Sequence, residues 1–207
     1  MNIAEFVRHN PIARPIWHAV RRVFEFHFIC LFDETELSGT DRIPQPALDG
    51  CTVDTPSAED LRDIAAHGEV PKTDEKMHEW LADERICLVV RHRGRIVAYS
   101  WCNLRECSYR SLALPLRPDE AYLYGARTFR EYRGKNIAPF LRGHLHRHLR
   151  QLGRTRMLSM SDTLNSAAMR FKSKIGARRL RLYCVFSVFG KHLPPLLLRN
   201  YEKDGTE

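Results

Sequence analysis

The feature that most constrains the fold is a strand, a basic glycine turn and an amphipathic helix that follow one another directly. The apolar run 121–129 predicts the strand, and the turn 133–135 reads Arg-Gly-Lys. Asn136 is a favoured N-cap, and Pro139 falls in the first helical turn, where its missing N–H costs nothing. One apolar stripe then marks the buried side of the helix: Ile137, Phe140, Leu141, Leu145, Leu149 and Leu152. A helix over 136–153 is therefore expected to pack on a sheet.

The start of this helix has the properties of an anion-binding site. Gly134 has no Cβ, so the backbone there can adopt positive φ and approach a ligand closely. The free N–H groups and the positive dipole end of the helix lie beside Arg133 and Lys135. This pattern favours a phosphate or pyrophosphate ligand, and the alternative is an ordinary basic loop that caps a helix.

Strands and helices alternate along most of the chain. Apolar runs predict strands at 51–55, 86–90, 95–103, 121–129, 155–161 and 179–189. Capped amphipathic patterns predict helices at 57–68, 73–84, 136–153 and 164–176. The second and third strands are joined by 91-RHRG-94 as a hairpin. This order predicts an α/β or α+β domain with a mixed sheet.

The first part of the chain, 1–45, is interpreted as an N-terminal extension of a domain formed by 46–207. Pro15 opens a predicted helix with Ile16, Val20 and Val23 on one side, and 24-FEFHF-28 alternates as a strand. The polar, Gly- and Pro-containing segment 38–46 is the expected linker. Packing of the extension against the domain is the favoured interpretation, and contact with a membrane, the acceptor site or a second subunit remains open.

Charge indicates an anionic partner. The chain has 33 basic and 25 acidic residues, a formal net charge of +8. A phosphorylated cofactor, an acidic protein, nucleic acid or a membrane surface would fit such a charge. Five arginines lie in or after the long helix, at positions 142, 147, 150, 154 and 156. They are interpreted as a solvated face that attracts a polyanionic cofactor or an acidic carrier protein, and nucleic acid is disfavoured because no aromatic residues are interleaved.

The six cysteines form no C-x-x-C pair and no zinc-site spacing, so reduced thiols and a cytoplasmic location are expected. His144 and His148 are four residues apart, but no third ligand lies near them, so no metal site is predicted and both are expected to pack against the sheet. The longest stretches without a charged residue are nine residues long, too short for a membrane-spanning helix. No signal-peptide pattern is seen at the N terminus.

A second motif, 165-NSAAMRFKSKIGA-177, follows the strand predicted at 155–161. With the Arg133–Ala138 turn and the order of elements, it resembles the GNAT superfamily of acyl-CoA-dependent N-acyltransferases over residues 50–190. The family's Arg/Gln-x-x-Gly-x-Gly/Ala loop corresponds to 133-RGKNIA-138. Its Asn-x-x-Ala…Gly-Phe pattern corresponds to Asn165, Ala168, Gly176 and Ala177. The resemblance implies a mostly antiparallel central sheet flanked by helices, and acetyl-CoA as co-substrate.

The resemblance also implies which residues hold that co-substrate. Backbone N–H groups of the turn would bind the pyrophosphate: Arg133, Gly134, Lys135, Asn136, Ile137 and Ala138. The main chain of the preceding strand would pair with the pantetheine arm at Ala126, Arg127 and Thr128. Asn165 would contact the cofactor near the thioester. Asn136 replaces the loop's first glycine, which a backbone N–H contact tolerates if the φ and ψ angles suit.

A more serious departure concerns acid catalysis. Many members have a tyrosine seven residues after the asparagine that protonates the departing thiolate, and here that position is Lys172. A lysine of lowered pKa or water could donate the proton, or acid catalysis is minor. For the amine's proton, Glu120, Tyr122, Tyr124 and Asp162 are the candidate bases or water-relay residues near the point where the central strands diverge.

The sequence therefore predicts transfer of an acetyl group from acetyl-CoA to the amine of a small molecule, with amino sugars and polysaccharide precursors as the narrower expectation. Two alternatives stay open. One is a non-catalytic module that binds CoA or an acyl carrier, prompted by Lys172. The other is an acyltransferase that uses an acidic acyl-carrier protein as donor, prompted by the arginines. A homodimer is left open as well.

Overall fold

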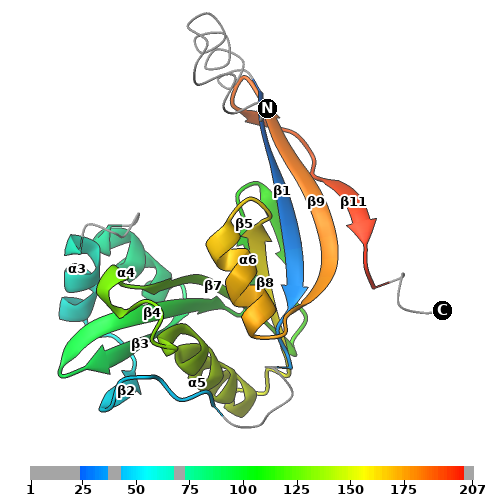
Figure 1. The fold of residues 1–207 in the computed structure, drawn as a ribbon. Coiled ribbons are helices and arrows are strands. Elements are labelled where there is room, and N and C mark those ends of the chain that lie inside the picture. The colour runs from blue at the N-terminus through cyan, green and yellow to red at the C-terminus, as the bar shows by residue number, and fades with distance from the viewer. Residues whose placement is uncertain (1–23, 37–42, 68–72, 203–207) are drawn as a thin grey trace, which may run out of the picture.

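The computed structural model of the chain describes residues 24–36, 43–67 and 73–202 (Figure 1). The helix expected from Pro15 and residues 38–42 of the expected linker lie outside these ranges. The predicted α+β architecture is confirmed: one large sheet forms the centre, and helices cover both of its faces.

The central sheet has the strand order β10-β9-β1-β8-β7-β4-β3-β2, and β11 pairs with β9 outside this path. Its strands are β1 (Phe24–Asp33), β2 (Cys51–Asp54), β3 (Ile86–His92), β4 (Arg95–Asn103), β7 (Glu120–Thr128), β8 (Arg156–Asp162), β9 (Arg178–Val188), β10 (Lys191–His192) and β11 (Leu196–Asn200). Within the described ranges, β7 and β8 are the one parallel pair. The sheet is therefore mostly antiparallel, as the family resemblance implied.

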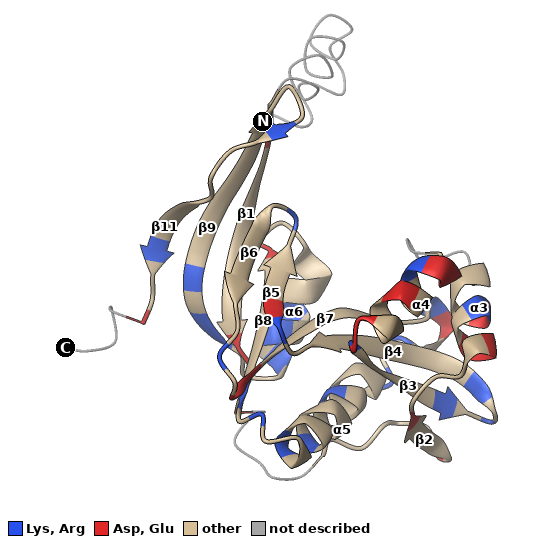
Figure 2. Cartoon of the chain, turned by 180° about the vertical axis from the view of Figure 1, so that it is seen from behind, with Lys and Arg blue, Asp and Glu red and all other residues tan. Residues whose placement is uncertain are grey.

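The four predicted helices are α3 (Ala58–Ala66), α4 (Asp74–Ala82), α5 (Ile137–Gln151) and α6 (Ser166–Lys174), with a short 3-10 turn at Arg130–Tyr132 before α5. Helix α3 begins with the predicted capping box, in which Ser57 and Asp60 bond each other's backbone N–H. Helices α5 and α6 lie on one face of the sheet, and α3 and α4 lie on the other (Figures 1 and 2).

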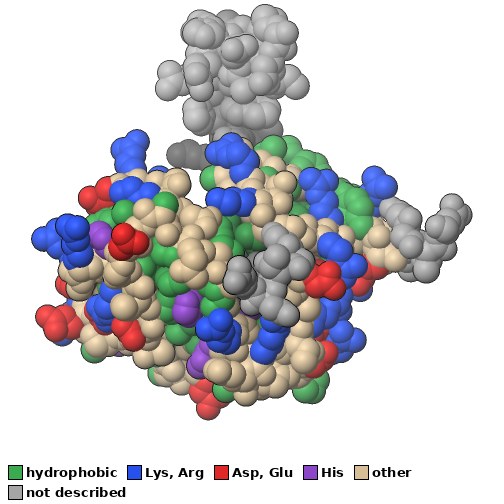
Figure 3. Space-filling model, turned by 60° about the horizontal axis from the view of Figure 1, so that its bottom comes forward, with side chains coloured by type: hydrophobic (Ala, Val, Ile, Leu, Met, Phe, Trp, Pro, Cys, Tyr) green, Lys and Arg blue, Asp and Glu red, His purple; other side chains and the backbone are tan. Residues whose placement is uncertain are grey.

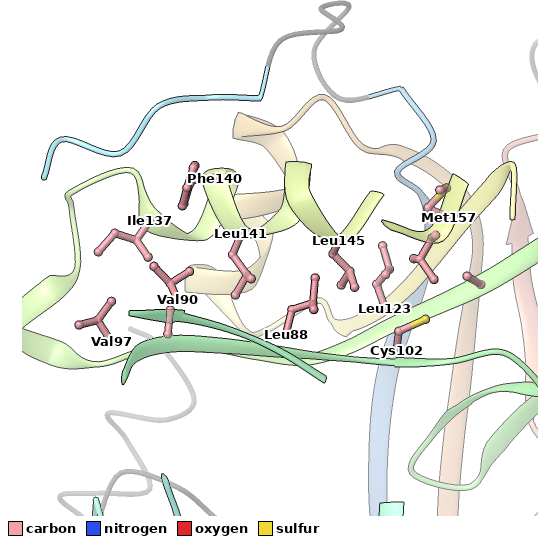
Figure 4. Packing of buried hydrophobic residues seen from close by; sticks show 13 residues of the cluster. Leu88, Val90, Val97, Cys102, Leu123, Ile137, Phe140, Leu141, Leu145 and Met157 are labelled. Carbon is pink, nitrogen blue, oxygen red and sulfur yellow. The ribbon is translucent and has the colours of Figure 1, made fainter. Parts of the chain in front are cut away.

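Helix α5 packs its predicted apolar stripe onto β3, β4, β7 and β8 (Figure 4). Ile137, Leu141 and Leu145 meet Val90, Leu88 and other strand residues in one buried cluster. Leu152, the last residue of the predicted stripe, lies beyond the helix and is 49% exposed. On the opposite face, α3 and α4 cover the alternate residues of β3 and β4 in a second cluster. This two-sided cover fixes the position of β7, on which the candidate site is built.

Strand β1 is longer than the predicted 24–28 segment, and it lies in the interior of the sheet. It runs antiparallel to β8, with Ile29 opposite Asp162, and antiparallel to β9, with Phe24 opposite Val188. The described part of the proposed N-terminal extension is thus a member of the central sheet. It places the residues that end β1 beside α5 and α6.

The sequence analysis missed a small hairpin between β4 and β7. Strands β5 (Glu106–Tyr109) and β6 (Leu112–Pro115) form a separate two-stranded sheet, with Arg110 at φ 57° in the turn. Each strand has only four residues, too short for a clear alternating pattern. Cys107 and Leu112 bury themselves against β1, β8 and β9. All six cysteines are free thiols, as predicted.

Candidate active site

The candidate site begins where the two parallel strands diverge. Strands β7 and β8 pair only over residues 120–122 and 156–158. Beyond that point β7 is paired with β4 alone, so its other edge is open toward β8. The diverged end of this pair is the feature that the sequence analysis expected at the mouth of the site.

A β-bulge shapes the open edge of β7. Tyr99 pairs with Arg127 and Trp101 pairs with Tyr124, so two residues of β7, Gly125 and Ala126, oppose one residue of β4. Gly125 has φ +59°, and a Cβ there would lie 3.2 Å from Trp101 Cδ1. Both the left-handed backbone and this close contact favour glycine. The bulge leaves the main chain of Gly125 and Ala126 exposed toward the cleft.

A cavity of about 540 Å³ extends from this edge to α5 and α6. It brings together nine of the residues predicted from sequence: Tyr124, Ala126, Arg127, Thr128, Arg133, Ala138, Asp162, Asn165 and Lys172. We call it the cofactor pocket. Ala126 and Asn165, two predicted cofactor-binding residues that are 39 positions apart in the chain, therefore line the same cavity.

The turn before α5 has the geometry that a bound phosphate needs. Gly134 has φ +79°, and a Cβ added there would meet no atom within 4 Å, so the space beside it is open. Asn136 adopts φ 60° and ψ 17°, the left-handed conformation in which it replaces glycine. Among the described residues, none accepts a hydrogen bond from the backbone N–H of Ile137 or Ala138. These N–H groups point out of the helix start and can bind an anion.

Asn136 differs from the prediction in one respect. Its side chain makes no cap on α5, because the left-handed backbone turns it away from the helix. Instead its Nδ2 donates to the carbonyl of Gln45 at 2.6 Å, and the carbonyl of Lys135 accepts from Ala47 N–H at 2.8 Å. Residues 45–47 thereby hold the turn from outside and leave the helix N–H groups unoccupied by a cap.

Asn165 is the N-cap of α6. Its Oδ1 accepts from the N–H of Ala168 at 3.1 Å. This leaves the side-chain NH₂ as a donor at the rim of the cofactor pocket. The N-x-x-A spacing recognised in the sequence is thus the spacing of a cap and the N–H that it binds.

The floor of the cofactor pocket is a buried charge cluster that the sequence did not predict. Lys172 donates to Glu34 Oε1 and to Ser159 Oγ (2.5 Å), and Arg142 Nε lies 3.2 Å from Glu34 Oε2. Glu34 is fully buried, and Arg142 and Lys172 are 3% and 5% exposed. His146, 1% exposed, lies next to them on α5, and neither of its ring nitrogens has a hydrogen-bond partner among the described residues.

Opposing effects set the charges in this cluster. Burial by itself would raise the pKa of Glu34, but Arg142 and Lys172 outweigh it and lower that pKa to about 2. Burial lowers the pKa of Lys172, against the attraction of Glu34. Burial also lowers the pKa of His146 to about 3, which keeps its ring neutral. The cluster therefore contains one carboxylate and two cations, with an excess of positive charge beside the cofactor pocket.

Arg142 corrects one prediction, whereas the role of Lys172 stays a prediction. Arg142 was expected on a solvated face of α5, but the side of the helix next to the apolar stripe is covered by α6, and Phe171 lies 5.5 Å from the guanidinium. Lys172 was a candidate proton donor on the condition that it is desolvated or near other cations. It is buried near Arg142, which meets that condition, and its ammonium group is bound by Glu34 and Ser159. Two other arginines are also engaged, since Arg154 donates to the carbonyl of Pro118 and Arg156 to Glu120.

A second charged cluster lies on the other side of the pocket. His27 Nδ1 is 2.9 Å from Asp162 Oδ2, and His27 Nε2 is 2.8 Å from Glu25 Oε1. Asp162 Oδ1 also accepts from the N–H of Leu164. We call this the Glu25–His27–Asp162 chain. Two of its members come from β1, so the sequence signal at Asp162 alone could not reveal it.

Tyr124 lies on the wall between the cofactor pocket and a second cavity of about 480 Å³, the acceptor pocket. Its hydroxyl accepts from Arg85 Nη1 at 3.3 Å. Burial raises the pKa of Tyr124 to about 12 even though Arg85 opposes the shift, so the phenol stays protonated near neutral pH. It is therefore unsuited to the predicted role of base but can donate a proton. Tyr122 is buried, and its ring stacks on Tyr124 at 5.3 Å.

Glu120, one of the predicted candidate bases, lies away from both pockets. It lies at the start of β7, four residues before Tyr124, which corresponds to about 13 Å along a strand. Its Oε1 is 3.1 Å from Arg156 Nη1 and 3.0 Å from Arg117 Nη2, and it lines neither pocket. The carboxylate stabilises the paired end of β7 and β8 instead.

The described ranges contain no group of three His, Cys, Asp or Glu side chains placed to hold a metal ion. His144 is half-buried with its ring against Phe140, at 4.6 Å, and His148 is half-buried too. No helix of the described chain has the length and apolar character needed to span a membrane.

The charges are unevenly distributed between the helices. Among the four α-helices, only α3 and α4 contain acidic residues, whereas the charged residues of α5 and α6 are all basic (Figure 2). On the face seen in Figure 3, Lys and Arg side chains are interspersed with Asp and Glu and do not gather in a single patch.

Comparisons with known proteins agree with this geometry. The sequence profile of the acetyltransferase (GNAT) family matches residues 56–177, more than half of the chain. The structure is similar to an acetyltransferase of the GNAT family from Colwellia psychrerythraea, with a TM-score of 0.57, 14% identity and coverage of 85% of this chain and 62% of that one. It is also similar to a GCN5-related N-acetyltransferase from Sphaerobacter thermophilus, with a TM-score of 0.56, 14% identity and coverage of 89% and 59%.

At these identities the structural similarity shows the fold alone. The chain spans 62% and 59% of the length of those two structures. Comparison with curated protein sequences returns no match.

Proposed function

Because the chain belongs to the acetyltransferase (GNAT) family, we propose that it transfers the acetyl group of acetyl-CoA to the primary amine of a small molecule. The observation that carries the proposal is the set of uncapped N–H groups at the start of α5, where Ala138 lines the same cavity as the diverged edge of β7. Gly134, Lys135, Asn136 and Ile137 lie outside the lining of that cavity. When bound, acetyl-CoA supplies a thioester: the amine nitrogen bonds to its carbonyl carbon, the C–S bond breaks, and the proton lost from nitrogen is balanced by one gained at sulfur.

The residues of the cofactor pocket fit this co-substrate. The N–H groups of Gly134 to Ala138 would bind the pyrophosphate, next to the charges of Arg133 and Lys135. The N–H of Arg133, which was also predicted to bind it, donates to the carbonyl of Arg130 instead. The main chain of Ala126 and Arg127 would pair with the amide groups of pantetheine as a further strand does. The carbonyl of Thr128 already accepts from Arg133 Nε at 3.0 Å. The NH₂ of Asn165 would hold the end of the arm near the thioester.

Tyr124 is the proposed proton donor to the thiolate. It carries a hydroxyl that is protonated near neutral pH, it lines both pockets, and Arg85 fixes its orientation. It would replace the tyrosine that is absent at position 172. Lys172 and Arg142 would act through their charge alone, by favouring the thiolate over the neutral thiol.

Asp162 remains the candidate acceptor of the amine proton. Its carboxylate lines the cofactor pocket, and through His27 it connects to Glu25, which is 57% exposed at its side chain. That arrangement supports a path by which a proton can reach solvent. Water could serve the same purpose, because an amine that arrives neutral needs only a weak base.

The test compares two glycines of matched geometry. Gly134 and Gly153 have φ +79° and +76°, and a Cβ at either would meet nothing within 4 Å, but only Gly134 lies at the start of α5. Gly134→Val and Gly153→Val should therefore lose similar stability through backbone strain. Only Gly134→Val should lower acetyl-CoA affinity, by about 10-fold or more, because hydrogen bonds to a charged group are lost. Titration calorimetry measures the affinity of each variant for acetyl-CoA. Equal affinities in the two variants would contradict the assignment of the Gly134 turn to the pyrophosphate.

An acyl-carrier protein as donor is the second candidate for the same reaction. The observation in its favour is that α5 carries no acidic residue. It is weakened because Arg142 is buried and Arg150 donates to the carbonyl of Thr35. Turnover measured with acyl-CoA and with acyl-carrier protein, each with the same amine, separates the two donors. Binding of acetyl-CoA without turnover of any amine would favour the non-catalytic module.

A further inference from the structure

The acceptor pocket is lined by cations and by no described acidic residue. Arg85, Arg110 and Arg127 contribute to its lining, and neither aspartate nor glutamate does so among the described residues. Glu25 lies 3.6 Å from Arg110 and Asp83 bonds Arg85, but both acidic residues lie outside the lining. Such a pocket attracts a negatively charged group and has no carboxylate with which to hold an ammonium ion.

Arg85 is fixed in position for such a group. Its Nε donates to Asp83 at 2.9 Å and its Nη1 donates to the Tyr124 hydroxyl at 3.3 Å. Its guanidinium lies over the rings of Trp80 and Tyr124, at 5.5 and 5.9 Å from their centres. None of the described residues accepts a hydrogen bond from Nη2, so that nitrogen can bind a carboxylate oxygen without breaking an existing bond.

Six of the other lining residues are aromatic: Trp80, Tyr99, Trp101, Tyr109, Tyr122 and Tyr124. Trp80 packs edge-on against Trp101 at 5.0 Å and against Tyr124 at 5.4 Å, and Tyr122 stacks on Tyr124. Rings that already contact one another are rigid, and they form flat apolar surfaces around the space they enclose. A flat apolar group of the acceptor would bury its faces against them.

Cations in the pocket also help the reaction. Positive charges near an amine lower its pKa, because they disfavour the ammonium form. An acceptor bound there would present a larger fraction of neutral amine, the form that attacks a thioester. Tyr99, Tyr109, Tyr124, Gly125, Ala126 and Arg127 line both cavities, so this amine would lie beside the open edge of β7.

From these contacts we infer that the acceptor is an amine that also carries a carboxylate and a flat apolar group, with an aromatic amino acid as its simplest form. The inference rests on the proposed acetyl transfer and specifies its second substrate. A neutral amino sugar, the narrower expectation from the sequence, fits less well, because it has no negative charge to pair with Arg85, Arg110 or Arg127.

The inference is tested with four amines that differ in one group at a time. Phenylalanine has all three features, phenethylamine lacks the carboxylate, alanine lacks the ring, and glucosamine is a neutral sugar. Trp80 and Trp101 line the pocket, so quenching of their fluorescence reports binding without any need for turnover. Phenylalanine should bind about 10-fold tighter or more than each of the other three, with acetyl-CoA present or absent.

A pair of substitutions tests whether Arg85 binds the carboxylate of the acceptor. Arg85→Gln is the test variant, and Arg105→Gln is its control. Both arginines bind Asp83, but Arg105 lies outside the lining of the acceptor pocket. Arg85→Gln should weaken phenylalanine binding about 10- to 100-fold and change phenethylamine binding less than about 3-fold. Arg105→Gln should change neither, and thermal unfolding checks that both variants are folded.

The inference is overturned if phenethylamine, alanine or glucosamine binds as tightly as phenylalanine, or if none of the four binds. It is also overturned if Arg85→Gln weakens phenylalanine and phenethylamine equally. Calorimetry with acetyl-CoA tests the proposed function separately: failure to bind acetyl-CoA defeats acetyl transfer, whereas amine binding that depends on Arg85 would still establish the carboxylate site.

Discussion

Strand β1 and the residue that follows it contribute to two charged clusters, which differ in their access to water. The buried charge cluster joins Glu34 to Arg142 and Lys172 with side chains that are at most 6% exposed. In the Glu25–His27–Asp162 chain, the corresponding exposures are 57%, 21% and 13%. Charges without access to water interact strongly and are costly to leave unpaired, whereas those near solvent are screened. The comparison indicates a structural role for the first cluster and leaves the second free to exchange protons.

The largest effect is expected from Glu34→Gln. Loss of the carboxylate charge leaves Arg142 and Lys172 buried without compensation, and breaking a buried pair in this way costs about 3–5 kcal/mol. Glu25→Gln is the matched control, because it removes the same charge from the exposed chain and should cost under about 1 kcal/mol. Chemical denaturation measures both free energies of unfolding. Similar losses of unfolding free energy in the two variants would show that the two clusters contribute equally to stability.

The loss of stability in Glu34→Gln should depend on pH. The pKa of Glu34 is about 2 in the folded protein against 4.5 as its ordinary value, so its stabilisation is present above pH 4.5 and is lost as the pH falls toward 2. The stability difference between wild type and Glu34→Gln should therefore narrow over that range. A constant difference would mean that the carboxylate is not ionised in the folded state.

Lys172→Met should have the next largest effect on stability and little effect on turnover. Glu34 keeps Arg142 as a partner, and the methionine can pack against Phe32 and Phe171, so the loss should be about 1–3 kcal/mol. If Lys172 acts only through its charge, kcat at saturating substrate should fall less than about 10-fold. A 100-fold loss, beyond any loss of folded protein, would make Lys172 a proton donor.

The buried His146 should make the stability of the protein depend on pH. His146 has a pKa of about 3 when folded and an ordinary value of 6.5, so the unfolded chain binds the proton first and stability falls between pH 6.5 and 3. His146→Leu removes that loss, and its stability relative to wild type should rise by about 1 kcal/mol or more as the pH falls from 7 to 5. His27→Gln is the control from the exposed chain. An unchanged pH dependence in His146→Leu would mean that the ring is protonated in the folded state.

Asp162→Asn should give the smallest stability change and the clearest change in kinetics. Its partner His27 keeps the bond to Glu25, so the loss should stay under about 1 kcal/mol. If Asp162 accepts the amine proton, the acid limb of the pH–rate profile should disappear. Glu25→Gln should retain that limb, because the carboxylate that lines the cofactor pocket is intact. An intact limb in Asp162→Asn would leave proton removal to water.

Much of the cofactor pocket was predictable because its signals are local. The turn at Gly134, the apolar stripe of α5 and the cap at Asn165 each depend on residues within one turn of one another. Backbone N–H groups at a helix start form an anion site regardless of the distant chain, so the motif and its neighbouring strand sufficed. The acceptor pocket was less visible, since the β5–β6 hairpin and Arg85 reach it from separate segments.

What the amino-acid sequence determined by itself was the four helices, six of the strands after residue 50 and the position of the glycine turn between β7 and α5, because periodicity and capping act over a few residues. It did not reveal β5, β6, β10 or β11. Tertiary structure alone decided the place of β1 between β8 and β9. That insertion brings Glu34 to Lys172 across 138 positions and His27 to Asp162 across 135. No local sequence pattern predicts such pairings. They depend on which strand lies between β8 and β9 and on the packing of α6 against α5.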